Sequence, residues 1–235
     1  IVADASCVIA ISDFERNLLT QAGFPSKRIE IIPPTVDLSI FERPRPSILD
    51  RFGLEGHPVI FSLARLAPGK RVDRLLHALH KVLEKHPDAR LIIAGPDYGA
   101  EPGLKQLTRS LGLDPYVTFA GTLERGEAAA LMQSASIFAM TTDFELFGIV
   151  LVEAMAAGTA IVAPRSTAVP EVVSDGRTGL LYDSSNVADL ADKLTTLLSQ
   201  PDLRAALVES AKADVRSRFD FKTNLDRLEA LYANI

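Results

Sequence analysis

The chain has 235 residues, 47% of them hydrophobic and 23% charged, and its 25 basic and 30 acidic side chains give a formal net charge of −5. This composition supports a sizeable core and excludes a disordered chain, and the acidic balance argues against a nucleic-acid partner. The single cysteine, Cys7, excludes an intrachain disulfide and a cysteine-built zinc site, and fits a reducing, cytoplasmic compartment.

The N-terminal part predicts a strand, a helix and a second strand. Two apolar runs mark the strands, helical spacing lies between them, and prolines interrupt the second run. We place these elements at 8–12, 13–24 and 29–37. The apolar period weakens over 38–58, which we interpret as a linker with a short helix near 47–53.

Short apolar strands then alternate with amphipathic helices. Such alternation predicts an α/β fold with a Rossmann-like, doubly wound parallel sheet that is covered on both faces. We expect strands at 59–64, 89–95, 117–121, 136–141 and 160–164, and helices at 72–86, 103–112, 125–135, 148–158, 187–200, 201–219 and 221–233. In such sheets the ligand lies at the carboxyl ends of the strands, so the loops that follow the strands carry the candidate site.

Two carboxylates interrupt the apolar stretch FELFGIVLVEAMAAGTAIVAP, at Glu145 and Glu153. The loop DFELFG follows a strand and precedes a helix, so amides near Phe147, Gly148 and Ile149 are candidates for binding phosphate. A carboxylate on each side of a phosphate site suits a sugar, a diphosphate and a ribose in that order. The alternative interpretation is that Glu153 is half exposed or paired with a basic residue and that Glu145 is an ordinary loop acid.

A basic loop follows the strand at 59–64 and carries Arg65, Lys70 and Arg71. Cations at the same sheet edge are suited to neutralising a diphosphate, although many basic loops are only solvated. The loop is not a Walker A motif, because Ala64 and Arg71 stand where that motif needs Gly and Ser or Thr. A glycosidase is also disfavoured, because Glu145 and Glu153 are too far apart along the chain to converge to the spacing of a catalytic carboxyl pair.

Several ordered motifs together resemble those of the retaining glycosyltransferases of family GT4, which have a GT-B fold. ARLAPGK resembles the G-R-L-x-x-x-K loop of that family, and ELFGIVLVE matches its E-x7-E motif with the central F-G intact. VPEVVSDGRTGLLY, VIAISDFERNLL and IEIIPPTVDLSIF resemble further family stretches in the same order. The chain departs from the family pattern at Ala64 and Arg71, where glycines are usual, which puts the shape of the basic loop in question.

The resemblance implies a division of the chain. Residues 1–42 would be the end of an N-terminal acceptor domain, 43–57 a linker, 58–218 the nucleotide-sugar donor-binding domain and 219–235 a C-terminal crossover helix. About half of a GT-B enzyme would then be absent, and the start at Ile1 fits a piece of a longer protein. Strands separated from the rest of their sheet predict self-association of the fragment.

The resemblance also implies roles for particular residues. Arg65 and Lys70 would bind the diphosphate and stabilise it as a leaving group, and Glu145 would orient the transferred sugar; these three are the predicted catalytic residues. Phe147, Gly148 and Ile149 would hold phosphate or sugar oxygens. Glu153 would bind the ribose, and the loop at Leu123 would meet the base.

The implied function is transfer of a hexose, with retention, from a UDP-, GDP- or ADP-sugar to a hydroxyl of a glycan, a lipid or a small molecule. We expect no metal and no other cofactor, because His77 and His80 have no third ligand in view. We expect a cytoplasmic protein, and any peripheral attachment to a membrane would be made through the absent N-terminal domain. A non-catalytic nucleotide-sugar binding module and a GT-B-type epimerase are the alternatives that the sequence leaves open.

Overall fold

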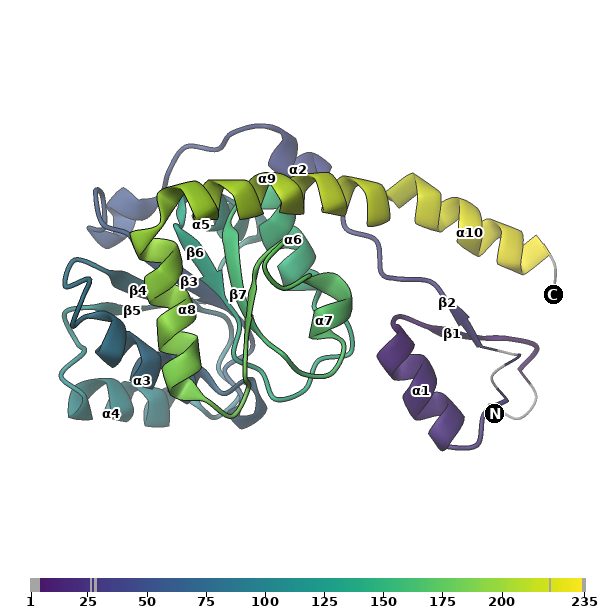
Figure 1. Ribbon diagram of the computed structural model, residues 1–235, viewed down its shortest axis with the longest axis horizontal. Coiled ribbons are helices and arrows are strands. Elements are labelled where there is room, and N and C mark those ends of the chain that lie inside the picture. The colour runs from purple at the N-terminus through teal and green to yellow at the C-terminus, as the bar shows by residue number, and fades with distance from the viewer. Residues whose placement is uncertain (1–4, 26, 28, 220, 234–235) are drawn as a thin grey trace.

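A six-stranded parallel sheet forms the centre of the computed structural model (Figure 1). The structure describes residues 5–25, 27, 29–219 and 221–233. Every neighbouring pair in the sheet is parallel, in the order β5-β4-β3-β6-β7-β8. The strands are β3 Val59–Leu63, β4 Arg90–Ala94, β5 Val117–Gly121, β6 Ile137–Ala139, β7 Ala160–Pro164 and β8 Leu180–Tyr182. The predicted doubly wound α/β fold is confirmed.

Helices cover both faces of this sheet. Successive strand residues alternate between two apolar cores, so that Phe61 packs in one core and Ile60 in the other. The first core lies under α5 Arg125–Ser134, α6 Ile149–Ala157 and α9 Pro201–Arg218; the second lies under α3 Val72–Val82, α4 Glu101–Ser110 and α8 Val187–Ser199. Burial of both faces explains why the strands are almost continuously apolar.

A smaller unit lies beside the sheet domain and consists of β1 Val8–Ala10, α1 Asp13–Gln21 and β2 Ile29–Ile31, with the two strands parallel. Helix α10 Phe221–Ala233 continues from the end of α9 and lies alongside this unit (Figure 1). Arg227 Nη2 of α10 donates to the Ile31 carbonyl at 2.8 Å. The Glu171 carboxylate of the sheet domain accepts the amides of Asp13 and Phe14, each at 2.7 Å, and so caps α1.

Several short elements differ from the sequence expectations. The predicted strand at 29–37 is only β2, because prolines follow within a few residues, and the short helix near 47–53 is the 3-10 turn η3 Leu49–Phe52. Strand β8 was not predicted, because Gly179 and Asp183 bound its short apolar run. The short helices α2 Ser39–Glu42, η4 Pro68–Lys70 and α7 Val169–Val172 were not predicted either, since three or four residues are too few to display a helical period. The division into domains stays a prediction, and its residues 1–4, 26, 28, 220 and 234–235 lie outside the described part.

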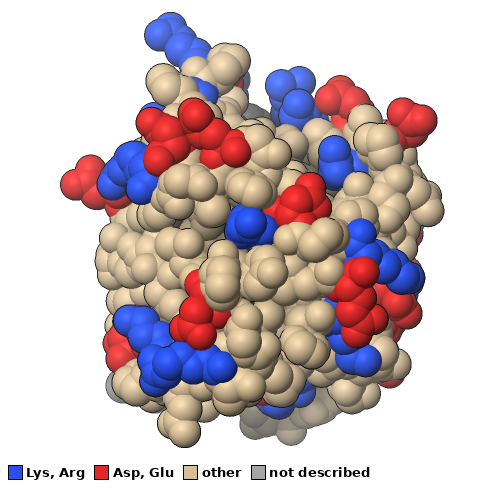
Figure 2. Space-filling view, turned by 90° about the vertical axis from the view of Figure 1, so that its left-hand side faces the viewer, with Lys and Arg blue, Asp and Glu red and all other residues tan. Residues whose placement is uncertain are grey.

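Charges of both signs are mixed on the surface. Figure 2 views the molecule from the left-hand side of Figure 1, and basic and acidic side chains are interspersed over that face. Within the described residues, no helix is long and apolar enough to cross a bilayer.

Candidate functional site

A cleft of about 400 Å³ opens at the carboxyl ends of β3 and β6. These neighbouring strands mark the point where the strand order of the sheet reverses, since β3 pairs with β4 on one side and with β6 on the other. Ligands of doubly wound folds bind at this point, and the volume is within the range of small-molecule sites. The lining comprises Ile11, Pro34, Ser62, Leu63, Ala64, Arg65, Lys70, Met140, Thr141, Thr142, Glu145, Phe147, Gly148, Ile149 and Val150.

The basic loop after β3 is tied to the loop after β6 by its backbone. The Thr141 hydroxyl donates to the Lys70 carbonyl at 2.9 Å, and the Asp143 amide donates to the Gly69 carbonyl at 3.1 Å. Ala64 fits the loop because its own φ is not positive; the tight approach falls instead at Gly95, where a Cβ would lie 1.8 Å from the Ala64 carbonyl oxygen. The loop therefore keeps a defined shape without the usual glycine.

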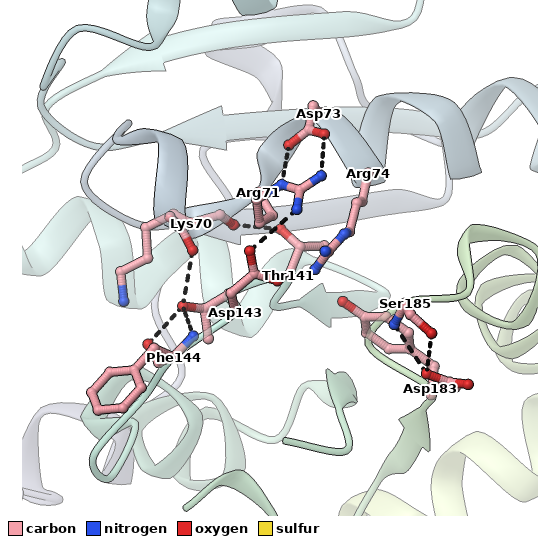
Figure 3. Close-up of polar contacts among 12 residues, drawn as sticks. Lys70, Arg71, Asp73, Arg74, Thr141, Asp143, Phe144, Asp183 and Ser185 are labelled. Atoms are coloured by element: carbon pink, nitrogen blue, oxygen red, sulfur yellow. Dashed lines mark hydrogen bonds and ion pairs between the residues drawn. The ribbon is translucent and has the colours of Figure 1, made fainter. Parts of the chain in front are cut away.

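Arg71 occupies the second position where glycine was expected, and it adopts the left-handed conformation at φ 50°. Its guanidinium lies between Asp73 and Asp143, at 3.0 Å and 3.2 Å, and the Lys70 side chain points away from this group (Figure 3). Hydrogen bonding to Asp73 raises the pKa of Arg71 above its ordinary value. Arg71 is thus engaged in bracing the loop and does not line the cleft.

Lys70 and Glu145 meet inside the cleft. Lys70 Nζ donates to Glu145 Oε2 at 3.0 Å, and the two side chains are 22% and 21% exposed. Arg65 is exposed, its guanidinium lies 5.6 Å from the centroid of the Tyr98 ring, and it has no carboxylate partner among the described residues. The cleft therefore presents one paired and one unpaired cation.

The start of α6 lines the same cleft as these cations. Gly148 precedes the helix with φ 92°, a conformation that favours glycine, and a Cβ there would lie 3.0 Å from Leu151 Cδ1. The amides of Phe147, Gly148 and Ile149 donate to none of the described residues, as expected for N–H groups at a helix start. These amides and the positive end of the helix dipole are suited to binding an anion.

Backbone contacts fix the segment that carries Glu145. The Glu145 amide donates to Thr167 Oγ1 at 3.0 Å, and the Glu145 carbonyl accepts the Ala168 amide at 3.2 Å. Next to it, the exposed ring of Phe144 packs edge to face against Phe14 of the smaller unit at 5.8 Å. The segment is thus held from two sides.

Glu153 lies one turn beyond Ile149 on the same side of α6 but does not line the cleft. It is half-buried and makes no hydrogen bond or ion pair with the described residues. Burial raises the pKa of Glu153, and the positive charge of Arg125 opposes that rise. Arg125 begins α5, which packs beside α6, and Leu123 lies two residues before Arg125.

The structure gathers six of the eight predicted site residues around one cleft, namely Arg65, Lys70, Glu145, Phe147, Gly148 and Ile149, and leaves Leu123 and Glu153 outside its lining. Sequence reasoning missed the polar lining residues Ser62, Thr141 and Thr142. A serine within an apolar strand and two threonines directly after a strand were available signals. Nothing in the sequence pointed to Ile11 and Pro34, which reach the cleft from the smaller unit and its connection.

His77 and His80 are exposed on α3. The described residues contain no group of three or more His, Cys, Asp or Glu side chains that could hold a metal ion.

Comparisons with known proteins identify relatives of the chain. A family model described as glycosyl transferases group 1 matches residues 45–214. The chain is 32% identical to the GDP-mannose-dependent alpha-(1-6)-phosphatidylinositol monomannoside mannosyltransferase of Mycolicibacterium smegmatis, over 97% of this chain and 62% of that protein. It is 31% identical to the D-inositol 3-phosphate glycosyltransferase of Corynebacterium kroppenstedtii, over 92% of this chain and 50% of that protein.

A similar solved structure is that of Anabaena Alr3699/HepE in complex with UDP and glucose, with a TM-score of 0.91 and 27% identity over 98% of this chain and 64% of that one. The chain spans less than two thirds of the length of these relatives.

Proposed function

The chain belongs to the group 1 glycosyltransferases, and from that membership we propose that it is the donor-binding part of a retaining enzyme that transfers a hexose from a nucleoside-diphosphate sugar to an acceptor hydroxyl. The observation that carries the proposal is the cleft between β3 and β6. Two cations, a carboxylate and the free amides at the start of α6 converge there on one space. A diphosphate attached to a polyol is the ligand whose groups match this set.

The departing nucleoside diphosphate gains negative charge as the sugar–oxygen bond breaks. We assign its stabilisation to Arg65, Lys70 and the amides of Phe147, Gly148 and Ile149, which are positioned before the reaction begins and need no large rearrangement. Lys70 must exchange Glu145 for a phosphate oxygen when the donor binds, since the two now share a hydrogen bond. Glu145 is then free to accept hydroxyl groups of the sugar.

The nucleoside extends from the diphosphate towards α5. Glu153 has no partner among the described residues, and a ribose diol would supply the donors that a half-buried carboxylate needs. The loop at Leu123 is assigned to the base. Relatives provide two candidate donors, since one is named for GDP-mannose and a solved neighbour holds UDP and glucose.

The acceptor is bound elsewhere in this proposal. We assign 1–42 to the end of an acceptor domain, 43–57 to the linker, 58–218 to the donor domain and 219–235 to the crossover helix. The smaller unit already reaches the cleft through Ile11 and Pro34. We propose that the protein works in the cytoplasm and that this chain alone transfers no sugar.

Calorimetric titration tests the proposal directly. The chain is titrated with UDP, GDP, ADP and their glucose and mannose conjugates, and then as Lys70→Met, with Lys85→Met as a control at an exposed lysine outside the cleft. We expect the wild-type chain to bind one of these nucleotides. The affinity for it should fall about tenfold or more in Lys70→Met, because a charge-assisted contact is worth about 1.5 to 3 kcal/mol, and should be unchanged in Lys85→Met. A well-folded chain that binds none of these ligands would contradict the proposal for this chain. Transfer measured with the full-length protein separates an enzyme from a binding module.

A further inference from the structure

Only two non-glycine residues of the described part adopt a positive φ, Arg71 at 50° and Thr167 at 48°. A β-branched side chain rarely adopts this conformation, and residues held in it tend to cluster at functional sites. Both residues adjoin the Lys70–Glu145 pair. Arg71 follows Lys70 in the chain, and Thr167 bonds the backbone of Glu145.

Thr167 lies in the loop between β7 and α7, far from Glu145 in sequence. Its hydroxyl oxygen accepts the Glu145 amide at 3.0 Å, and the neighbouring Ala168 amide donates to the Glu145 carbonyl at 3.2 Å. Both backbone polar groups of Glu145 are therefore bonded to one short loop. The left-handed turn at Thr167 is what presents its hydroxyl and the next amide to the same residue.

We infer that Thr167 is a positioning residue for the sugar-binding carboxylate: its hydroxyl holds the Glu145 backbone so that the side chain faces Lys70 and the cleft. Thr167 does not line the cleft, so it acts through Glu145 and not on the ligand. The inference rests on the proposed role of Glu145. The positioning role explains why threonine occupies position 167, although glycine would adopt the left-handed conformation there with less strain.

Three substitutions separate the hydroxyl from the strain. Thr167→Ser keeps the hydroxyl and removes the branch, Thr167→Val keeps the branch and removes the hydroxyl, and Thr167→Gly removes both and relaxes the turn. The readouts are the unfolding midpoint and the preference for a nucleotide sugar over its free nucleoside diphosphate, measured with UDP-glucose against UDP and GDP-mannose against GDP. We expect Thr167→Ser to keep the preference for the nucleotide sugar, and Thr167→Val and Thr167→Gly to lower it about fivefold or more. The unfolding midpoint of Thr167→Gly should be no lower than that of Thr167→Val.

Thr178→Val is the matched control. Thr178 is buried, and its hydroxyl also accepts a backbone amide, that of Ser174 at 2.9 Å, but it does not line the cleft. We expect this change to lower the unfolding midpoint and to leave the nucleotide preference unaltered. If the preference follows the unfolding midpoint across all four variants, Thr167 is merely structural and the inference is wrong.

A second readout does not depend on nucleotide binding. Hydrogen exchange of the Glu145 amide, followed by NMR, should become about tenfold faster in Thr167→Val and Thr167→Gly and stay unchanged in Thr167→Ser. Failure of the wild-type chain to bind any nucleotide would overturn the proposed function, whereas equal exchange at Glu145 in all variants would overturn the positioning role.

Discussion

Replacing Glu145 by glutamine should tighten the binding of a free nucleoside diphosphate. Lys70 and Glu145 lie 3.0 Å apart, which corresponds to a Coulomb attraction of about 5.5 kcal/mol at an effective dielectric constant of about 20. Both side chains are about one fifth exposed, so desolvation and side-chain ordering leave a net stabilisation of about 1 kcal/mol. A diphosphate must displace Glu145 from Lys70, and Glu145→Gln removes most of that competition. UDP or GDP should then bind about fivefold more tightly.

The assay is titration of Glu145→Gln with a nucleoside diphosphate and with the matching nucleotide sugar. The sugar conjugate should lose its advantage, because the carboxylate assigned to its hydroxyls is gone. Glu209→Gln serves as the control, since it weakens another lysine–glutamate pair, with Lys212, on the exposed side of α9. If Glu145→Gln instead weakened UDP and GDP as strongly as Lys70→Met, Glu145 would contribute to nucleotide binding itself and the assignment of roles would be wrong.

Three further predictions concern the rest of the molecule. Burial raises the pKa of Glu153, so between pH 4.5 and the folded-state pKa the native chain holds a proton that the unfolded chain has lost, and stability falls as the pH rises. Glu153→Gln should therefore stabilise the fold at pH 7 but not below pH 4.5, as measured by denaturant titration. The same variant should bind UDP or GDP about tenfold more weakly. Glu171→Ala removes the acceptor of two amides, so it should lower the stability of α1 by about 1 to 2 kcal/mol and speed hydrogen exchange at the amides of Asp13 and Phe14. Unchanged exchange at these amides would refute the cap. Phe138→Ala, at a fully buried position, should lower the unfolding free energy by about 3 to 5 kcal/mol, and a loss below about 1 kcal/mol would contradict the described core.

The sequence was informative where a property depends on neighbours along the chain. The apolar runs around Phe61 and Phe138 are long enough to identify strands, and the residues after them, Lys70 and Glu145, could be placed at one edge because parallel strands end together. Strand β8 escaped prediction because Gly179 and Asp183 bound it directly, so its apolar run is no longer than the strand itself.

Properties that depend on tertiary contacts could not be predicted. Thr167 and Glu145 are bonded through side chain and backbone across two different loops, and no local pattern marks such a pair. The role of Arg71 was equally hidden, because its orientation away from the cleft follows from Asp143, which belongs to the loop after β6. The departure of this position from glycine left the loop shape in question, and the left-handed arginine resolves it.

The contacts that secure the smaller unit have a consequence for synthesis on the ribosome. Its α1 is capped by a carboxylate about 158 residues further on, and β2 receives an arginine that is 196 residues further on. Translation adds about 5 to 20 residues per second, so β2 is synthesised roughly 10 to 40 s before that arginine. The sheet domain can close over its own cores during this interval, whereas β1, α1 and β2, which are synthesised before that domain, reach their final contacts only after it has been made.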